Sequence, residues 1–254
     1  MGRRIINLLA WDASPPGLYL RAWEQQRFDE ALADIFGYYA VQLGNPGLDT
    51  LAMSRIQHLW HADLAAAEEQ AVWRSDLRLN PAALPLDAGS VDLVTLPRTL
   101  EQHVDPHTVL REVERVLVPE GRVAISGINP WSLWGLRHWR TGVPPVTGEL
   151  IAPRRLRDWL RLLGFEVESA RYGCWRPATP SARRLERSAW MDRLGPRVAP
   201  HGGGAYFLVA VKRVHGALMM PRGWKERRRE LAGAPVSIAG KLDVPADATK
   251  KVPS

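Results

Sequence analysis

Two features of the sequence could bind a nucleotide. The turn Gly44-Asn45-Pro46-Gly47 follows a β-branched and aromatic run, and Asp63 ends a second such run 19 residues after Gly44. In doubly wound folds, glycines after the first strand let the backbone approach a ligand closely, and an acid about 20 residues later binds the ribose hydroxyls. Asp63 therefore predicts a ribose contact, because one carboxylate can accept from two hydroxyls. The alternative is a solvated aspartate at a strand end.

The histidines do not form a metal-binding pattern. His58 and His61 lie three residues apart in one predicted strand, so their side chains point to opposite faces. His103 and His107 lie on either side of an Asp-Pro helix boundary and have no third ligand beside them. We therefore expect no metal site.

The elements that would position these residues are clearest between residues 84 and 127. Residues 91–96 form an apolar run behind an Asp-Ala-Gly-Ser turn, which predicts a strand. Asp105 predicts a helix N-cap with Pro106 in the first turn, and residues 123–125 predict the next strand. Strand, helix and strand make a parallel βαβ unit, whose ligand crevice lies at the carboxyl ends of the strands.

The same stretch resembles a known family. The string LPLDAGSVDLV, followed by LEQHVDP, LREVERVLVPEG and RVAISG, is similar to the second half of class I S-adenosylmethionine-dependent methyltransferases. Within them it most resembles the methyltransferase-11 group, which includes the ubiquinone/menaquinone C-methyltransferases. The resemblance implies an α/β, doubly wound, Rossmann-like sheet with helices on both faces, and S-adenosylmethionine as the cofactor.

The resemblance also implies roles for particular residues. It places Asp76 opposite the adenine amino group and Leu77 in the adenine slot. Leu96 and Pro97 begin a loop that also contains Glu101 and closes over the methionine and the reacting methyl group. Arg98, the next residue, is either a ligand for an anionic substrate group or an exposed loop arginine.

The glycine-rich motif of the family is altered in this sequence. Gly44 fits the first glycine, whereas Gln42 stands in place of the acid and Pro46 and Leu48 in place of the later glycines. Gly47 lies one position out of register. A proline removes an N–H donor and stiffens the loop. Gly44 and Gly47 remain candidates for cofactor binding, and the departure favours an alternative in which the fold has lost catalysis.

The rest of the chain divides into one domain and two flanking segments. Residues 1–14 form an N-terminal segment, residues 15–214 the methyltransferase-like domain, and residues 215–254 a flexible basic tail. Periodicity within the domain predicts helices over residues 15–36, 48–54, 65–70 and 154–163, and strands over residues 38–43, 56–63, 71–77, 165–170 and 205–211.

Two insertions interrupt the predicted pattern, near residues 131–153 and 171–204. The first carries Trp131 and Trp134, which form either a substrate lid or an apolar segment packed on the sheet. The second contains a basic helix over residues 182–194, whose arginines are either a solvated face or an attractant for an anionic substrate.

Charge is distributed unevenly along the chain. The net charge is −6 over residues 1–136, +7 over residues 137–197 and +6 over residues 212–254. An acidic cofactor half argues against a uniformly basic nucleic-acid binder. The single cysteine, Cys174, and the lack of a recognisable signal peptide, lipidation motif or transmembrane run favour the cytoplasm.

These observations predict methyl transfer from S-adenosylmethionine to a small-molecule acceptor. Two alternatives remain open: a catalytically inactive scaffold or regulator, and an RNA-modifying enzyme that uses the basic regions. The sequence identifies no catalytic residue, and it leaves the oligomeric state open.

Overall fold

The computed structural model describes residues 11–64, 76–141 and 149–213. The elements in chain order are α2 (Pro15–Leu32), β1 (Tyr39–Leu43), β2 (His58–Leu64), β3 (Leu77–Leu79), β4 (Val91–Pro97), η1 (Leu100–Gln102), α3 (Pro106–Val116), β5 (Leu117–Ile128), α4 (Leu133–Thr141), α5 (Pro153–Leu162), β6 (Phe165–Gly173), α6 (Ala182–Arg187), α7 (Trp190–Val198) and β7 (Ala205–Lys212). The helix predicted over residues 65–70, most of the strand predicted over residues 71–77 and the tail lie outside the described residues.

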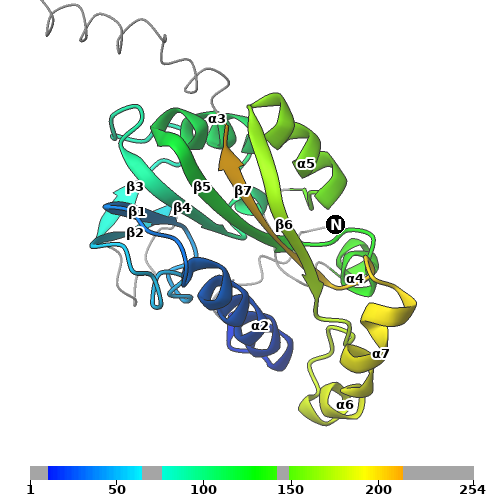
Figure 1. Ribbon diagram of the computed structural model, residues 1–254. Helices are drawn as coiled ribbons and strands as arrows, with labels where there is room; N and C mark the ends of the chain where they lie inside the picture. The colour runs from blue at the N-terminus through cyan, green and yellow to red at the C-terminus, as the bar shows by residue number, and fades with distance from the viewer. Residues whose placement is uncertain (1–10, 65–75, 142–148, 214–254) are drawn as a thin grey trace, which may run out of the picture. The chain divides into compact units, whose positions relative to one another are not determined.

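The strands form one sheet in the order β3-β2-β1-β4-β5-β7-β6 (Figure 1). The first five strands pair in parallel, and β7 lies antiparallel between β5 and β6. Parallel neighbours leave their carboxyl ends at one edge of the sheet, so β1, β2, β4 and β5 all end at that edge. The predicted doubly wound α/β fold is confirmed.

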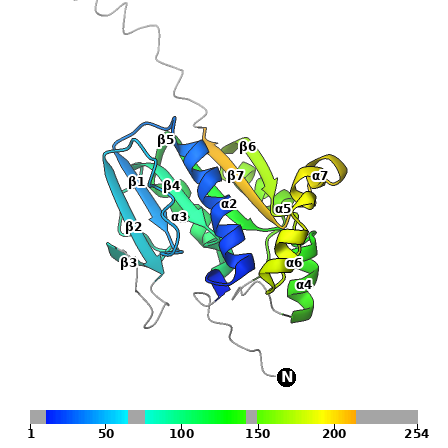
Figure 2. The same ribbon diagram turned by 90° about the horizontal axis from the view of Figure 1, so that it is seen from below.

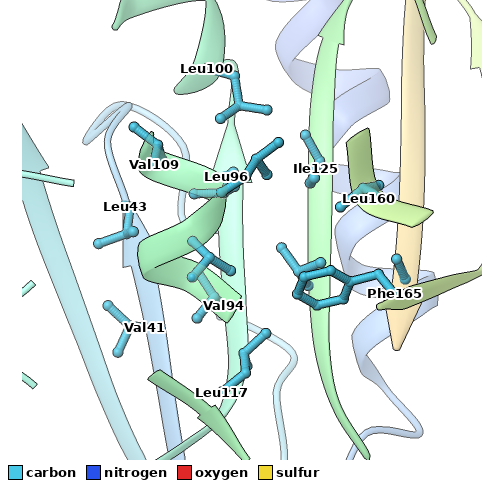
Figure 3. Close-up of a cluster of buried hydrophobic side chains, with 14 of the residues drawn as sticks. Val41, Leu43, Val94, Leu96, Leu100, Val109, Leu117, Ile125, Leu160 and Phe165 are labelled. Carbon is cyan, nitrogen blue, oxygen red and sulfur yellow. The ribbon is translucent and has the colours of Figure 1, made fainter. Parts of the chain in front are cut away.

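Helices cover both faces of the sheet (Figure 2). On one face, Phe28 and Leu32 of α2 pack against strand residues such as Leu93 and Ala124. On the opposite face, α3 and α5 bury a larger cluster, in which Val109 and Leu160 lie over the strands (Figure 3). The sheet is therefore buried on both sides, as the nearly continuous apolar runs of its strands require.

Helix α3 forms where its capping residues predict. The Asp105 carboxylate accepts from the backbone N–H groups of His107 and Thr108 at 3.0 and 3.2 Å. Pro106 occupies the first turn, where its missing N–H removes no helical hydrogen bond. Its apolar residues Val109, Leu110, Val113 and Val116 are all buried, so the helix packs one apolar face on the sheet.

Other predicted boundaries are wrong. Residues 48–54 form turns rather than a helix, because polar side chains bond the local backbone there, as described below. Of the strand predicted over residues 71–77, the structure describes only the last two residues: Asp76 lies in a bend, and Leu77 begins β3, which runs to Leu79. The basic helix predicted over residues 182–194 is two helices, α6 and α7, separated at Ser188-Ala189. None of the described helices is long and apolar enough to cross a membrane.

Candidate functional site

The loop after β1 opens at the carboxyl edge of the sheet. Gly44 has a φ of 78° and Asn45 a φ of 48°, so two successive residues are left-handed. Such a turn favours glycine at position 44, because a side chain is strained in this region. The Gly44 N–H donates to the Ala62 carbonyl at 2.7 Å, which brings the turn beside the end of β2.

Gln42 determines the shape of this loop. Its Nε2 donates to the carbonyl of Leu48 at 2.6 Å, and its Oε1 accepts from the N–H and hydroxyl of Thr50 at 2.9 and 2.7 Å. Thr50 in turn bonds the hydroxyl of Thr95 in β4 at 2.6 Å. Only an amide can both donate and accept in this way, so Gln42 stabilises a compact loop in place of the predicted helix.

Two features of the loop fit a ligand. The Nδ2 of Asn45 is buried and has no hydrogen-bond partner within the described residues. A side chain at Gly47 would meet only Asn45 Oδ1, at 3.6 Å, so the space in front of Gly47 is otherwise open among those residues. A buried amide without a partner costs free energy unless a ligand or water accepts from it. The loop thus offers a hydrogen-bond donor at the carboxyl edge of the sheet, where doubly wound folds bind their ligands.

Asp63 lies next to this loop. It is the second-last residue of β2 and is only 5% exposed. Because Ala62 accepts from Gly44, the carboxylate and the turn share the carboxyl edge of the sheet. The structure therefore brings Gly44 and Asp63 together, and the ribose contact stays a prediction.

Asp76 and Leu77 lie differently from the prediction. Asp76 precedes β3 instead of ending a strand, and its Oδ2 accepts from the His61 N–H at 3.0 Å. Leu77 is the first residue of β3 and is 41% exposed. The residue that follows β3 is Asn80, whose Oδ1 accepts from Ala82 N–H at 3.0 Å. The prediction ended the third strand at Leu77, where β3 begins, because apolar alternation alone could not fix its register with β2.

The residues after β4 also differ from the prediction. The Leu96 side chain is fully buried in the core beneath α3, so it does not face the carboxyl edge, where Pro97 ends the strand (Figure 3). Arg98 is neither an exposed loop arginine nor available to an anionic substrate. It is 3% exposed and bonds both carboxylate oxygens of Asp12, at 2.9 and 3.1 Å.

Arg98 is the centre of a buried charge network. Its Nε lies 3.3 Å from Oε2 of Glu24, a residue of α2 that has no exposed surface. The other Glu24 oxygen accepts from the Ser126 hydroxyl at 2.8 Å. Burial raises the pKa of Glu24, while Arg98 and Ser126 act in the opposite direction. The network joins the N-terminal segment, α2, β4 and β5 at the carboxyl edge.

Glu101 supplies a titratable group at the same edge. Its Oε1 accepts from the Ile128 N–H at 2.5 Å, and its Oε2 is buried without a hydrogen-bond partner among the described residues. Burial raises the Glu101 pKa to about 8, against the smaller lowering effects of Ile128 and Arg98. A carboxyl group with this pKa can take up and release a proton near neutral pH.

Gly127 makes room for this carboxyl group. A Cβ at Gly127 would overlap the Tyr206 hydroxyl and lie 2.8 Å from Glu101 Oε1. The resemblance placed Glu101 in the loop after this strand but gave it no role of its own. Its only signal is an acid four residues after Pro97, the last residue of β4, and that signal is weak.

The two candidate tryptophans have different environments. Trp134 is fully buried against Trp11, and its indole N–H donates to the Arg176 carbonyl at 2.6 Å, so it is a core residue and not a substrate ligand. Trp131 is 79% exposed and lines a cavity of about 300 Å³ with Asn129, Tyr172 and His201. Only Trp131 can therefore contact an acceptor.

Comparisons with known proteins agree with this geometry. A family model described as a methyltransferase domain matches residues 37–125. The uncharacterized protein YafS of Escherichia coli K12 is 34% identical over 164 residues, which cover 62% of this chain and 65% of that protein. The chain thus matches slightly less than two thirds of this relative's length.

Solved structures share the fold. A chain of the complex that contains the Haloferax volcanii Trm112 methyltransferase activator is 23% identical, with a TM-score of 0.54 over 81% of this chain and 96% of that one. A SAM-dependent methyltransferase from Archaeoglobus fulgidus is 17% identical, with a TM-score of 0.54 over 76% of this chain and 94% of that one. The predicted resemblance to class I methyltransferases is confirmed, and the more specific likeness to the quinone C-methyltransferases stays a prediction.

Proposed function

We propose that this chain, which has a class I methyltransferase domain, transfers a methyl group from S-adenosylmethionine to a small-molecule acceptor. The observation that carries the proposal is the buried Asn45 amide, which has no partner among the described residues, in a left-handed turn beside Asp63. Both groups lie at the carboxyl edge of parallel strands, where doubly wound folds bind their ligands.

Each of these residues has a role suited to its chemistry. Asp63 accepts hydrogen bonds from the ribose hydroxyls, and the Asn45 amide donates to the carboxylate of the methionine end. Gly44 allows the backbone to approach without a Cβ. When bound, S-adenosylmethionine supplies an already activated methyl group, so orientation of the acceptor can provide much of the rate.

Glu101 is our candidate for the proton acceptor. Its Oε2 is without a partner among the described residues, and its pKa of about 8 lets it receive a proton from the attacking group of the acceptor. The cavity beside Trp131, Tyr172 and His201 offers aromatic surface for the acceptor itself. Its volume, about 300 Å³, suits a small molecule better than a macromolecule.

Calorimetric titration with S-adenosylmethionine and S-adenosylhomocysteine tests the cofactor site. We expect Asp63→Asn to raise the Kd about 10- to 100-fold, because hydrogen bonds to a charged group contribute about 1.5–3 kcal/mol. Asp76→Asn is the matched control. Its carboxylate bonds His61, so we expect less than about a twofold change.

A second candidate function is a methyltransferase fold that acts as a scaffold. The compact loop that Gln42 stabilises, with no helix after β1, favours it. If the folded wild-type protein binds neither S-adenosylmethionine nor S-adenosylhomocysteine, the enzyme proposal is wrong and the scaffold is the better explanation. If Asp76→Asn weakens binding and Asp63→Asn does not, our assignment of the ribose contact is wrong.

A further inference from the structure

Helix α7 exposes one apolar face. Trp190, Leu194 and Val198 follow one another at intervals of four residues, so they lie on the same side of the helix. They are 59%, 47% and 81% exposed, and no residue of α7 is buried. Asp192, on the other side, accepts from the Tyr19 hydroxyl at 2.5 Å and from Arg176 at 2.6 Å. These contacts fix the helix with its apolar side outward.

Helix α4 adds a second set of exposed apolar side chains. Trp131 precedes the helix, and Leu133, Leu136 and Trp139 follow along it, all more than half exposed. In both views α4, α6 and α7 gather at one end of the molecule, near the junction of β6 and β7 (Figures 1 and 2). A cluster of large exposed apolar residues on a monomer commonly marks an interaction site.

Arginines accompany these apolar residues. Residues 181–198 contain five arginines and two acids, and Asp192 is already bonded to Arg176. The five arginines are Arg183, Arg184, Arg187, Arg193 and Arg197. Within the described part of the chain, none of them forms an ion pair with an acidic side chain. Between Trp131 and Thr141 the sequence has no acid at all. These three helices therefore carry both exposed apolar residues and positive charge.

We propose that α4, α6 and α7 form a docking surface for anionic phospholipid membranes. Exposed tryptophans suit the boundary between headgroups and acyl chains, and leucine and valine suit the acyl side. Arginines bury their stems along apolar surface while the guanidinium groups meet lipid phosphates. The proposal goes beyond methyl transfer and does not depend on it.

Two other occupants fit less well. A second copy of the chain, docked symmetrically through this surface, would oppose its arginines with identical arginines. Nucleic acid would satisfy the arginines, but it offers no apolar medium for Leu194 and Val198. A lipid surface satisfies the charge and the aliphatic side chains together.

Vesicle co-sedimentation of the full chain tests the proposal. We expect binding to vesicles of equal parts phosphatidylglycerol and phosphatidylcholine, and little binding to phosphatidylcholine alone. Trp190→Ser combined with Val198→Ser should lower the partition constant about tenfold or more. Arg183→Gln, Arg184→Gln and Arg187→Gln together should lower it about 100-fold, since each arginine contributes about fivefold.

Matched variants separate this surface from other sources of binding. Phe36→Ser removes an equally exposed aromatic residue elsewhere and should leave the partition constant unchanged. Thermal unfolding of each variant checks that its fold is intact. Equal binding to both vesicle types would overturn the proposal. The proposal would also be overturned if vesicle binding is lost only in a variant of the tail, in which glutamine replaces Lys225, Arg227, Arg228 and Arg229. Displacement of the vesicles by a single-stranded oligonucleotide would overturn it as well.

Discussion

Replacing Arg98 with methionine would leave two buried carboxylates without their cation. The Asp12 side chain is 11% exposed and the Glu24 side chain is not exposed, so water cannot compensate either charge. Removal of one partner from a buried ion pair costs about 3–5 kcal/mol of unfolding free energy. We expect Arg98→Met to fall in this range near neutral pH.

The loss of unfolding free energy in Arg98→Met should depend on pH in a defined direction. Burial already raises the pKa of Glu24, and Arg98 opposes that rise. In the variant the pKa rises further, so the folded state keeps a proton that the unfolded state releases above its ordinary pKa. Stability relative to the wild type is therefore regained as the pH falls, and we expect the deficit in unfolding free energy to be smaller near pH 5.5 than near pH 7.5.

Urea unfolding followed by circular dichroism at both pH values measures these differences. Arg122→Met is the control, because Arg122 also forms a two-bond ion pair, with Glu168, but both side chains are about one third exposed. Such surface pairs contribute about 0–1 kcal/mol. An Arg98→Met loss below about 1 kcal/mol, or one that does not change with pH, would refute the account of a buried network.

Three further predictions concern the same edge of the sheet. The pKa of Glu101 in the folded state is about 8, so its protonation stabilises the folded state below the ordinary carboxyl pKa, and this stabilisation is lost as the pH rises to about 8. Glu101→Gln should therefore flatten the pH profile of unfolding and slow methyl transfer. Gly127→Ala should destabilise the protein by about 1–3 kcal/mol in thermal unfolding, because the new Cβ would overlap Tyr206, whereas unchanged stability would contradict the packing. Gln42→Leu should cost about 2–4 kcal/mol of unfolding free energy, since it leaves the Leu48 carbonyl and the Thr50 N–H unsatisfied.

Local sequence signals predicted much of the fold correctly. Asp105 and Pro106 identify the start of α3 because capping depends on residues within one helical turn. The apolar runs of β4 and β7 identify buried strands, because this signal too lies within a few consecutive residues. By contrast, the register of the short edge strand β3 depends on its pairing with β2, which no local pattern specifies.

The candidate site was harder to predict because its contacts are distant in sequence. Arg98 pairs with Asp12, 86 residues away, and Glu101 bonds Ile128, 27 residues away. Trp131 and Trp134 are the same residue type three positions apart, yet one is 79% exposed and the other fully buried. Trp134 packs with Trp11, Tyr19 and Cys174, and these contacts are distant in the sequence.

The position of β7 affects how the chain can fold during synthesis. Among the strands that the structure describes, β6 pairs with β7 alone, and β7 follows it after about thirty residues. At about 5–20 residues per second, β6 emerges about 2–6 s before the strand that will pair with it, and both its edges are open during that time. Open strand edges invite aggregation, and charged side chains oppose it. The exposed Glu166 and Arg171 of β6 therefore protect the nascent chain as well as the finished edge of the sheet.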